Sequence, residues 1–280
     1  MTTPTLEPDT RPDADADGIS PKRFGWITIT VAIIGGMVVA GTVTSGFFAN
    51  LRDVLRDETT ISQSIAGVTA LRVDIDSVGM EIEFGDVSQA ELRVQSKGFT
   101  KADAWQLVTE GGELVVERVG GSRNGGGFGE EELSLTLPES LEDGKLDAQV
   151  NVTSGAATID GDFGDLVIET NSGASDFEGS AANLSLTTGS GASNIDAEVP
   201  GDVTLAASSG ALNAIFGGAA PKSTDISIES GFGSVSLPDG TYKLETGLNE
   251  SGMANVNVRQ SDSAKNTLSV SVGSGFLTVE

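Results

Sequence analysis

A Ser-Gly pair recurs through the second half of the chain at nearly constant spacing. Successive pairs are separated by 18, 18, 19, 21, 21 and 23 residues. The pairs are Ser154-Gly155, Ser172-Gly173, Ser190-Gly191, Ser209-Gly210, Ser230-Gly231, Ser251-Gly252 and Ser274-Gly275. A period near 20 residues is typical of repeat proteins, in which each unit packs only on its neighbours. The repeat therefore predicts a stack of similar units, because one unit is too small to bury an apolar face alone.

Each pair stands between two segments in which apolar and polar residues alternate. Such alternation predicts β-strands that bury one face. The earlier sequence Ser77-Val78-Gly79 fits the same pattern as a variant corner. The predicted core positions lie six, four and two residues before each serine: Leu71, Val73, Ile75; Ala148, Val150, Val152; Leu166, Ile168, Thr170; Leu184, Leu186, Thr188; Val203, Leu205, Ala207; Thr224, Ile226, Ile228; and Leu268, Val270, Val272.

In the strand that follows each glycine, two positions are also expected to face the core. They are the first and the fourth residue after the glycine. The first position is small in the early repeats and large in the late ones: Ala156, Ala174, Ala192, Ala211, Phe232, Met253 and Phe276. The second holds Ile159, Phe177, Ile195, Ala214, Val235, Val256 and Val279. The change from small to large side chains predicts a core that widens toward the C-terminus.

The predicted fold is all-β: a β-helix-like solenoid wound from a single chain, with 18–23-residue repeats over residues 67–280, preceded by one transmembrane helix. Glycine permits the backbone conformation of a sharp corner, and the serine hydroxyl can bond a neighbouring backbone group. Only the repeat at Ser251 is out of phase, since Tyr242, Leu244 and Thr246 come three residues early. The segment 247–249 is interpreted as a bulge.

Further strands are expected before the regular repeats, including 91–95, 105–109, 113–119 and 133–137. A tight hairpin is predicted at Gly111-Gly112, because paired glycines suit two-residue turns. The glycine-rich segment 120–129 is predicted to be a loop.

The first 66 residues divide into three parts. Residues 1–23 are acidic and proline-rich and predict a disordered tail. Residues 24–51 carry no charge and are long enough to span a bilayer as a helix. A cleaved signal peptide is the alternative, although the preceding tail is long for one and no clear cleavage site follows. Residues 52–66 are interpreted as a polar juxtamembrane linker.

Basic residues near the span indicate its orientation. Three precede it, Arg11, Lys22 and Arg23, and two follow it, Arg52 and Arg56. Because basic residues favour the cytoplasmic side, the N-terminus is predicted to be cytoplasmic and the C-terminal domain extracellular.

The net charge of −25, from 41 acidic and 16 basic residues, argues against nucleic acid as a partner. The chain has no Cys and no His, which excludes thiol nucleophiles, imidazole acid-base chemistry and His/Cys metal sites. No cofactor is predicted.

Acidic residues supply the only candidate metal ligands. Asp160, Asp162 and Asp165 lie in a segment interpreted as a connecting loop, where carboxylates could bind calcium. The pairs Asp176 with Glu178 and Asp196 with Glu198 are predicted to point outward. Because no Lys, Arg or His accompanies these pairs, polysaccharide-cleaving chemistry is not supported, and the chain is predicted not to be an enzyme.

The run Leu137-Pro138-Glu139-Ser140-Leu141, followed by repeated Ser-Gly-Ala and alternating strands, resembles the bacterial "putative-adhesin" family of unknown function. The resemblance covers about residues 66–280. It implies an N-terminal membrane anchor and a surface-displayed β-solenoid with recurring Ser-Gly corners, and it implies no functional residues.

The predicted function is that of a single-pass membrane protein whose extracellular solenoid acts as a non-catalytic structural or interaction module, adhesin-like or envelope-sensing. Its expected partners are the lipid bilayer, through residues 24–51, and surface proteins or glycans. A calcium- or glycan-binding module is one alternative. Self-association is another, because the last strand, 276–279, ends the chain without an obvious cap and could pair with another copy.

Overall fold

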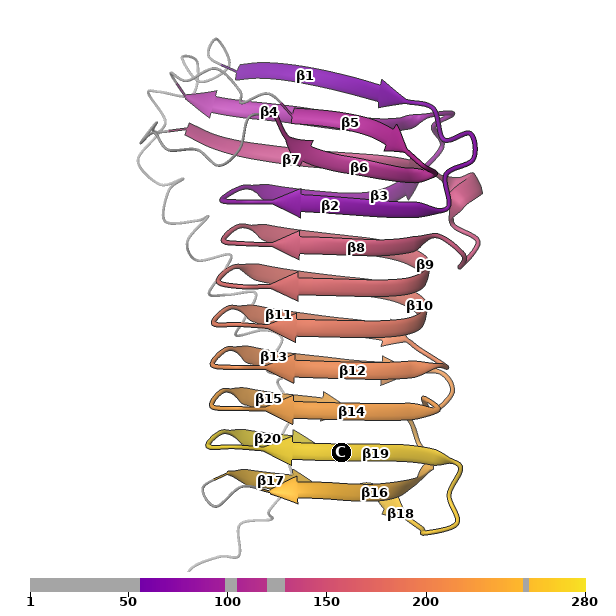
Figure 1. Cartoon of the computed structure of the whole chain (residues 1–280), viewed down its shortest axis with the longest axis vertical. Helices are drawn as coiled ribbons and strands as arrows, with labels where there is room; N and C mark the ends of the chain where they lie inside the picture. The colour runs from indigo at the N-terminus through magenta and orange to yellow at the C-terminus, as the bar shows by residue number, and fades with distance from the viewer. Residues whose placement is uncertain (1–55, 99–104, 120–128, 249–251) are drawn as a thin grey trace, which may run out of the picture. The chain divides into compact units, whose positions relative to one another are not determined.

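The computed structural model describes residues 56–98, 105–119, 129–248 and 252–280 (Figure 1). The chain divides into two units, Met1–Leu51 and Arg52–Glu280, and every described residue belongs to the second. The predicted tail (1–23) and membrane span (24–51) lie outside the described residues. Within the described ranges, no helix has the length and apolar character needed to cross a membrane.

The described part of the chain is built from β-strands, with one short 3-10 helix, η2 (Glu139–Leu141), so the all-β expectation is confirmed. The strands are β1 (Arg56–Gln63), β2 (Ala70–Ile75), β3 (Gly79–Gly85), β4 (Ala90–Gly98), β5 (Trp105–Glu110), β6 (Glu113–Arg118), β7 (Gly129–Pro138), β8 (Asp147–Val152), β9 (Ala156–Thr170), β10 (Ala174–Thr188), β11 (Ala192–Glu198), β12 (Asp202–Ala207), β13 (Ala211–Gly217), β14 (Ser223–Ile228), β15 (Phe232–Ser236), β16 (Thr241–Leu248), β17 (Met253–Val256), β18 (Arg259–Gln260), β19 (Asn266–Val272) and β20 (Phe276–Val279). They form one large mixed sheet.

Most strands pair in parallel and in register, in two ladders. The first ladder runs β6, β2, β8, the second half of β9, the second half of β10, β12, β14, β19 and β16. The second runs β7, β3, the first half of β9, the first half of β10, β11, β13, β15, β20 and β17. A strand of ladder one, its corner and the following strand of ladder two are called a rung. Successive rungs lie one below another in Figure 1.

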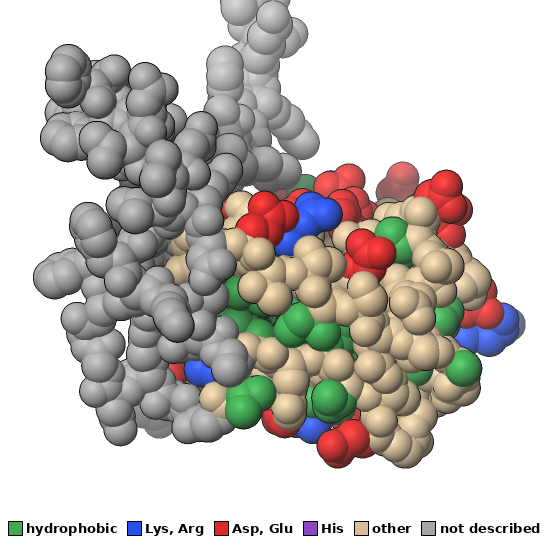
Figure 2. All heavy atoms as spheres, turned by 90° about the horizontal axis from the view of Figure 1, so that it is seen from above, with side chains coloured by type: hydrophobic (Ala, Val, Ile, Leu, Met, Phe, Trp, Pro, Cys, Tyr) green, Lys and Arg blue, Asp and Glu red, His purple; other side chains and the backbone are tan. Residues whose placement is uncertain are grey.

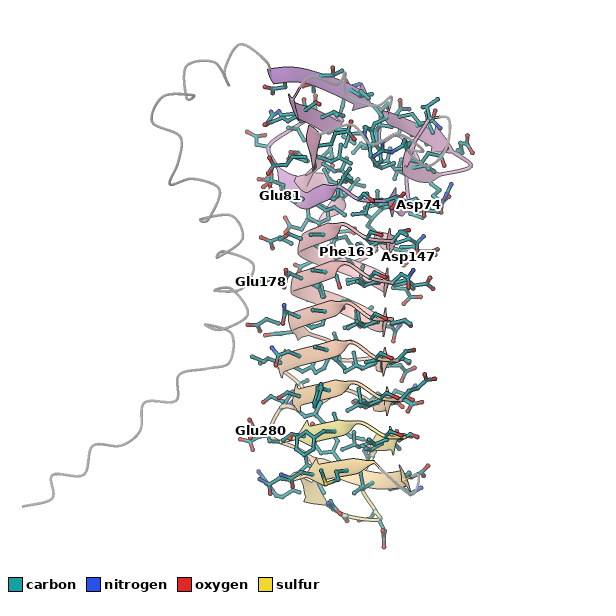
Figure 3. All side chains as sticks on the ribbon, turned by 90° about the vertical axis from the view of Figure 1, so that its left-hand side faces the viewer. Asp74, Glu81, Asp147, Phe163, Glu178 and Glu280 are labelled. Carbon is teal, nitrogen blue, oxygen red and sulfur yellow. The ribbon has the colours of Figure 1, made fainter. Side chains whose placement is uncertain are left out.

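The core lies between the two ladders. All the core positions predicted before the serines are buried, from Leu71 to Val272. Figure 3 shows Glu81 and Glu178 projecting from one side of the stack, Asp74 and Asp147 from the other, and Phe163 between the ladders. Alternation of side chains along each strand therefore sets which residues meet in the core.

The corner glycines are required by contact between rungs. A Cβ atom on Gly191 would lie 2.1 Å from the carbonyl oxygen of Gly173, and one on Gly173 would lie 2.1 Å from that of Gly155. These corner glycines do not have positive φ. The serine bonds through its backbone, since the N–H of Ser190 donates to the carbonyl oxygen of Asn171 at 2.6 Å. The expectation that an unusual backbone conformation selects glycine here was wrong, because close approach of the next rung selects it.

The first position after each corner glycine faces outward, contrary to the prediction. Phe232, Met253 and Phe276 are exposed, while Ile159 and Val235, which occupy the second position, are buried. Residues three apart on a strand lie on opposite faces, so the two predicted positions cannot both face the core. The proposed widening of the core therefore has no basis in these residues.

Antiparallel strands close the N-terminal end. β4 pairs with β7, β1 pairs with β4, and β5 forms a hairpin with β6. The predicted Gly111-Gly112 turn is confirmed, with positive φ at both glycines. β1 then reaches ladder one, where the side-chain amide of Gln63 donates to Thr109 Oγ1 at 3.2 Å. Residues 56–63, assigned to the linker 52–66 from sequence, therefore form a strand.

The C-terminal rungs are not stacked in chain order. β19 and β20, the last strands of the sequence, lie between β14/β15 and β16/β17. The predicted free end at Phe276–Val279 was therefore wrong, because β20 pairs on both sides. Leu244 aligns with Leu268, and Leu248 aligns with Val272. This register corrects the predicted phase of the Ser251 repeat, which has one extra residue between Leu248 and Met253.

Candidate interaction surfaces

An acidic column runs along the outer face of ladder two. Asp160, Glu178 and Asp196 occupy equivalent positions on neighbouring strands, and all three are exposed. Neighbouring strands are about 4.8 Å apart, so these like charges lie close together and repel. The outward orientation predicted for Glu178 and Asp196 is confirmed. This column disfavours contact with any other acidic surface.

The outer face of ladder one carries a hydrogen-bonded polar column. Asp147 Oδ1 accepts from the N–H of Asp165 at 2.9 Å, and Asn183 Nδ2 donates to Asp165 Oδ1 at 2.7 Å. Asn183 Oδ1 then accepts from the N–H of Asp202 at 2.8 Å. These side chains tie each rung to the next, which gives them a structural role that sequence reasoning had missed.

The candidate calcium ligands Asp160, Asp162 and Asp165 lie in strand β9. The prediction that this segment is a connecting loop was therefore wrong. Ser180 Oγ donates to Asp162 Oδ1 at 2.6 Å, and Asp165 belongs to the polar column of the opposite ladder. Asp160 belongs to the acidic column. Among the described residues there is no group of three or more acids placed to hold a metal ion.

Acidic residues do crowd together near η2. Burial, followed by the negative charges of Asp162, Glu139 and Asp160, raises the pKa of Glu142. Its neighbour Asp143 has the opposite shift, because a hydrogen bond from Lys145 lowers its pKa. The structure therefore brings Asp160 and Asp162 close enough to Glu142 for mutual repulsion.

Four hydroxyl groups are buried beside the central corners. Ser175 Oγ lies 2.9 Å from Thr170 Oγ1 and 2.8 Å from Ser193 Oγ, and Thr188 Oγ1 lies 2.7 Å from Ser193 Oγ. Neighbouring rungs have apolar residues at the same positions, for example Val152 and Leu212. Because the hydroxyls bond one another, the cluster links the two ladders and offers no activated nucleophile.

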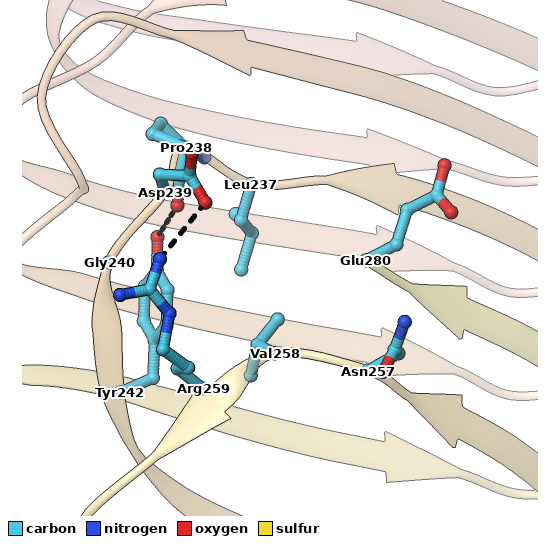
Figure 4. A pocket seen from close by; sticks show the side chains of 9 residues that line it. All are labelled: Leu237, Pro238, Asp239, Gly240, Tyr242, Asn257, Val258, Arg259 and Glu280. Atoms are coloured by element: carbon cyan, nitrogen blue, oxygen red, sulfur yellow. Dashed lines mark hydrogen bonds and ion pairs between the residues drawn. The ribbon is translucent and has the colours of Figure 1, made fainter.

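A shallow pocket of about 280 Å³ lies at the C-terminal end, between the loop after β15 and the segment after β17 (Figure 4). Tyr242 Oη donates to the carbonyl oxygen of Pro238 at 2.9 Å, and Arg259 bonds Asp239 at 3.3 Å. Burial, followed by the charge of Asp239, raises the pKa of Tyr242. Tyr242 and Arg259 thus bond to other residues of the lining. The volume of the pocket falls near the lower limit for ligand sites, about 300 Å³.

Three large apolar side chains form a second exposed column, on the last three rungs of ladder two. Phe232 pairs with Phe276, and Phe276 pairs with Met253. Their exposed fractions are 66%, 39% and 63%. The corresponding residues on the four preceding strands of ladder two are alanines, so this apolar column is confined to the C-terminal end. Sequence reasoning had found these residues but had placed them in the core.

The N-terminal end holds a buried ion pair. Arg118 lies 3.1 Å from Glu131, and their side chains are 10% and 1% exposed. The guanidinium also lies 4.7 Å above the ring of Trp105. Seen from above, this end shows charged side chains, mostly acidic, around hydrophobic ones (Figure 2).

The fold was compared with solved structures. A structure described as a putative adhesin from Bacteroides fragilis matches with a TM-score of 0.51 and 11% identity, over 80% of this chain and 97% of that one. A putative adhesin from Parabacteroides merdae matches with a TM-score of 0.47 and 12% identity, over 80% and 96%. A putative lipid binding protein from Parabacteroides distasonis matches with a TM-score of 0.46 and 15% identity, over 82% and 98%.

No protein-family model and no curated protein matches the sequence. At 11% identity, the likeness to the Bacteroides fragilis structure concerns the fold. It supports the resemblance to the putative-adhesin family at that level.

Proposed function

We propose that the chain is a single-pass membrane protein that displays a β-solenoid outside the cell as a non-catalytic structural or interaction module. The observation that carries this proposal is the in-register parallel pairing of the two ladders, which gives a long rod-like scaffold with outward polar columns. In repeat proteins of this kind, binding uses extended outer surfaces.

The chemistry of those surfaces favours interaction over catalysis. The outward positions of the central rungs carry acids, amides and small hydroxyl residues, and the segment 147–221 has ten acids and no Lys or Arg. A catalytic acid-base pair needs carboxylates whose environments differ, whereas Glu178 and Asp196 share one exposed face. An adhesin-like or envelope-sensing role fits such a scaffold, with surface proteins or glycans as partners.

Anchoring rests on the sequence of residues 24–51, which are uncharged and long enough to span a bilayer. The N-terminus is placed in the cytoplasm and the rungs outside the cell, with more basic residues before the span than after it.

Because the chain has no cysteine, single-cysteine labelling tests this topology directly. Thr204→Cys lies at an exposed outward position of β12, and Ala14→Cys lies in the N-terminal tail. In intact cells that express the full chain, a membrane-impermeant maleimide should label Thr204→Cys and should label Ala14→Cys only after lysis. The reverse pattern would contradict the proposed orientation, and equal labelling of both before lysis would contradict the anchor.

A further inference from the structure

The C-terminal end of the stack has an unpaired strand edge. Among the described residues, β17 pairs with β20 alone, while β18 covers only Thr241 and Tyr242 of β16. The N–H groups of Met253 and Asn257 donate to the carbonyl oxygens of Gly275, just before β20, and Val279 in β20. Because the bonding direction alternates along a strand, the backbone groups of Ala254 and Val256 point away from β20. An edge of this kind is a template for another strand.

The inward side chains of this end rung are also incompletely covered. Leu244, Ala254 and Val256 are only partly buried, although they point toward the core. Their counterparts one rung above, Leu268 and Leu277, are completely buried. A strand added to β17 would cover Ala254 and Val256, as the next rung covers their counterparts elsewhere.

The exposed apolar column leads to the same edge. Phe232, Phe276 and Met253 lie in register, and Met253 is the last of them. An added strand would place a side chain beside Met253, within the range of cross-strand contacts. The unpaired backbone, the uncovered core and the apolar column thus all meet at β17.

Charge selects the occupant of this edge. The segment 241–266 contains three basic residues, Lys243, Arg259 and Lys265, and three acidic ones, Glu245, Glu250 and Asp262, so its net charge is zero. The whole chain carries −25. Two copies would repel one another along the acidic column, but at this end they meet without that repulsion.

We propose that two copies of this chain associate end to end through antiparallel pairing of β17 with the β17 of the second copy. The inference rests on the rungs and is independent of the membrane anchor. A two-fold axis perpendicular to both the stack and its strands reverses strand direction, so the pairing is antiparallel. Because β18 occupies the start of the β16 edge, the pairing involves ladder two alone.

Strand alternation fixes the register. Inward residues of one β17 must lie opposite inward residues of the other. This is possible only when the two-fold axis passes through a residue, because a register shifted by one residue would place inward side chains opposite outward ones. With the axis at Asn255, Ala254 lies opposite Val256 of the second copy, and the free N–H and C=O groups of both residues are satisfied. Asn255 then faces its own counterpart in a non-hydrogen-bonded pair, where the Cα atoms are about 4.5 Å apart.

Cross-linking of the full chain in mild detergent tests this arrangement. Asn255→Cys should give a disulfide-linked dimer under mild oxidation, since the Cα separation lies within disulfide range. Asn213→Cys is the matched control, because Asn213 occupies the same outward column on β13, in the middle of the stack. It should form no disulfide-linked dimer, although its β17 edge is unchanged.

A second variant tests the strand pairing itself. Ala254→Pro removes an N–H that points away from β20, and proline is tolerated at such edge positions. Combined with Asn255→Cys, it should abolish the cross-linked dimer while the far-ultraviolet circular dichroism stays unchanged. Absence of a disulfide-linked dimer for Asn255→Cys would overturn the proposal. The same result is expected if a strand from a different protein, and not a second copy, pairs with β17. Equal dimer formation by Asn213→Cys would overturn it as well, because random collision would then explain the cross-link.

Discussion

The two ends of the stack terminate the same two ladders in different ways. At the N-terminal end, β4 and β5 extend the ladders as antiparallel strands, and β1 crosses from one to the other. Leu92 and Leu107, the inward residues of these strands, are buried. At the C-terminal end, β16 and β17 are outermost, and their inward residues Leu244, Ala254 and Val256 are only partly buried.

The difference shows that a repeated unit does not protect its own end. Each inner rung is covered by the next, whereas a terminal rung needs either a different structure or a partner. The N-terminal end has the different structure, with a closing strand and a buried ion pair. The C-terminal end has the short strand β18 as its only described covering.

The largest difference in stability loss is expected between alanine substitutions of two arginines at opposite ends of the stack. Arg118→Ala would remove the guanidinium that lies 3.1 Å from the buried carboxylate of Glu131, and loss of one partner of a buried pair costs about 3–5 kcal/mol. Arg259→Ala removes an exposed pair, whose side chains are 73% and 100% exposed, and should cost less than about 1 kcal/mol. Chemical denaturation monitored by circular dichroism measures both. Equal losses would show that the N-terminal end is no more tightly closed than the C-terminal one.

A second difference in stability loss is expected between two core leucines that are in register on neighbouring rungs. Leu268→Ala removes a completely buried side chain and should destabilise the fold by about 2–5 kcal/mol. Leu244, in register with it on the end rung, is only partly buried, so Leu244→Ala should cost clearly less. Thermal unfolding at low protein concentration, where association does not contribute, gives the comparison. A larger loss for Leu244→Ala would mean that the end rung is covered.

The smallest effect concerns two adjacent acids near η2. The raised pKa of Glu142 means that its charged form destabilises the fold, and that this destabilisation is lost as pH falls through the raised pKa. Glu142→Gln should therefore stabilise the protein at pH 7, by no more than about 0.5 kcal/mol, and have no effect at low pH.

Asp143→Asn is the matched control of opposite sign. The lowered pKa of Asp143 contributes stability above its ordinary pKa, and this contribution is lost as pH falls through the lowered value. The variant should be slightly less stable at pH 7. Melting temperatures from pH 3 to pH 8 test both variants, and shifts of the same sign would contradict the assigned causes.

Much of the fold could be predicted because its determinants are local. Alternation placed Leu71 through Val272 in the core, and the Gly111-Gly112 pair located a hairpin. The site was harder to predict. Phe232 and Phe276 were assigned to the wrong face of their strands, so the exposed apolar column was missed. Counting residues along the strand would have revealed it, because side chains alternate between the two faces.

The sequence by itself determined the period, the inward columns and the places where the chain turns, because these follow from residue spacing along single strands. Tertiary structure alone decided the order of the rungs. The connection from β15 to β16 passes over the place that β19 later fills, and no local pattern records which rung lies beside which. Complementary inward side chains and close contact between corners select the neighbours, so the exposed end is β17 and not the last strand of the chain.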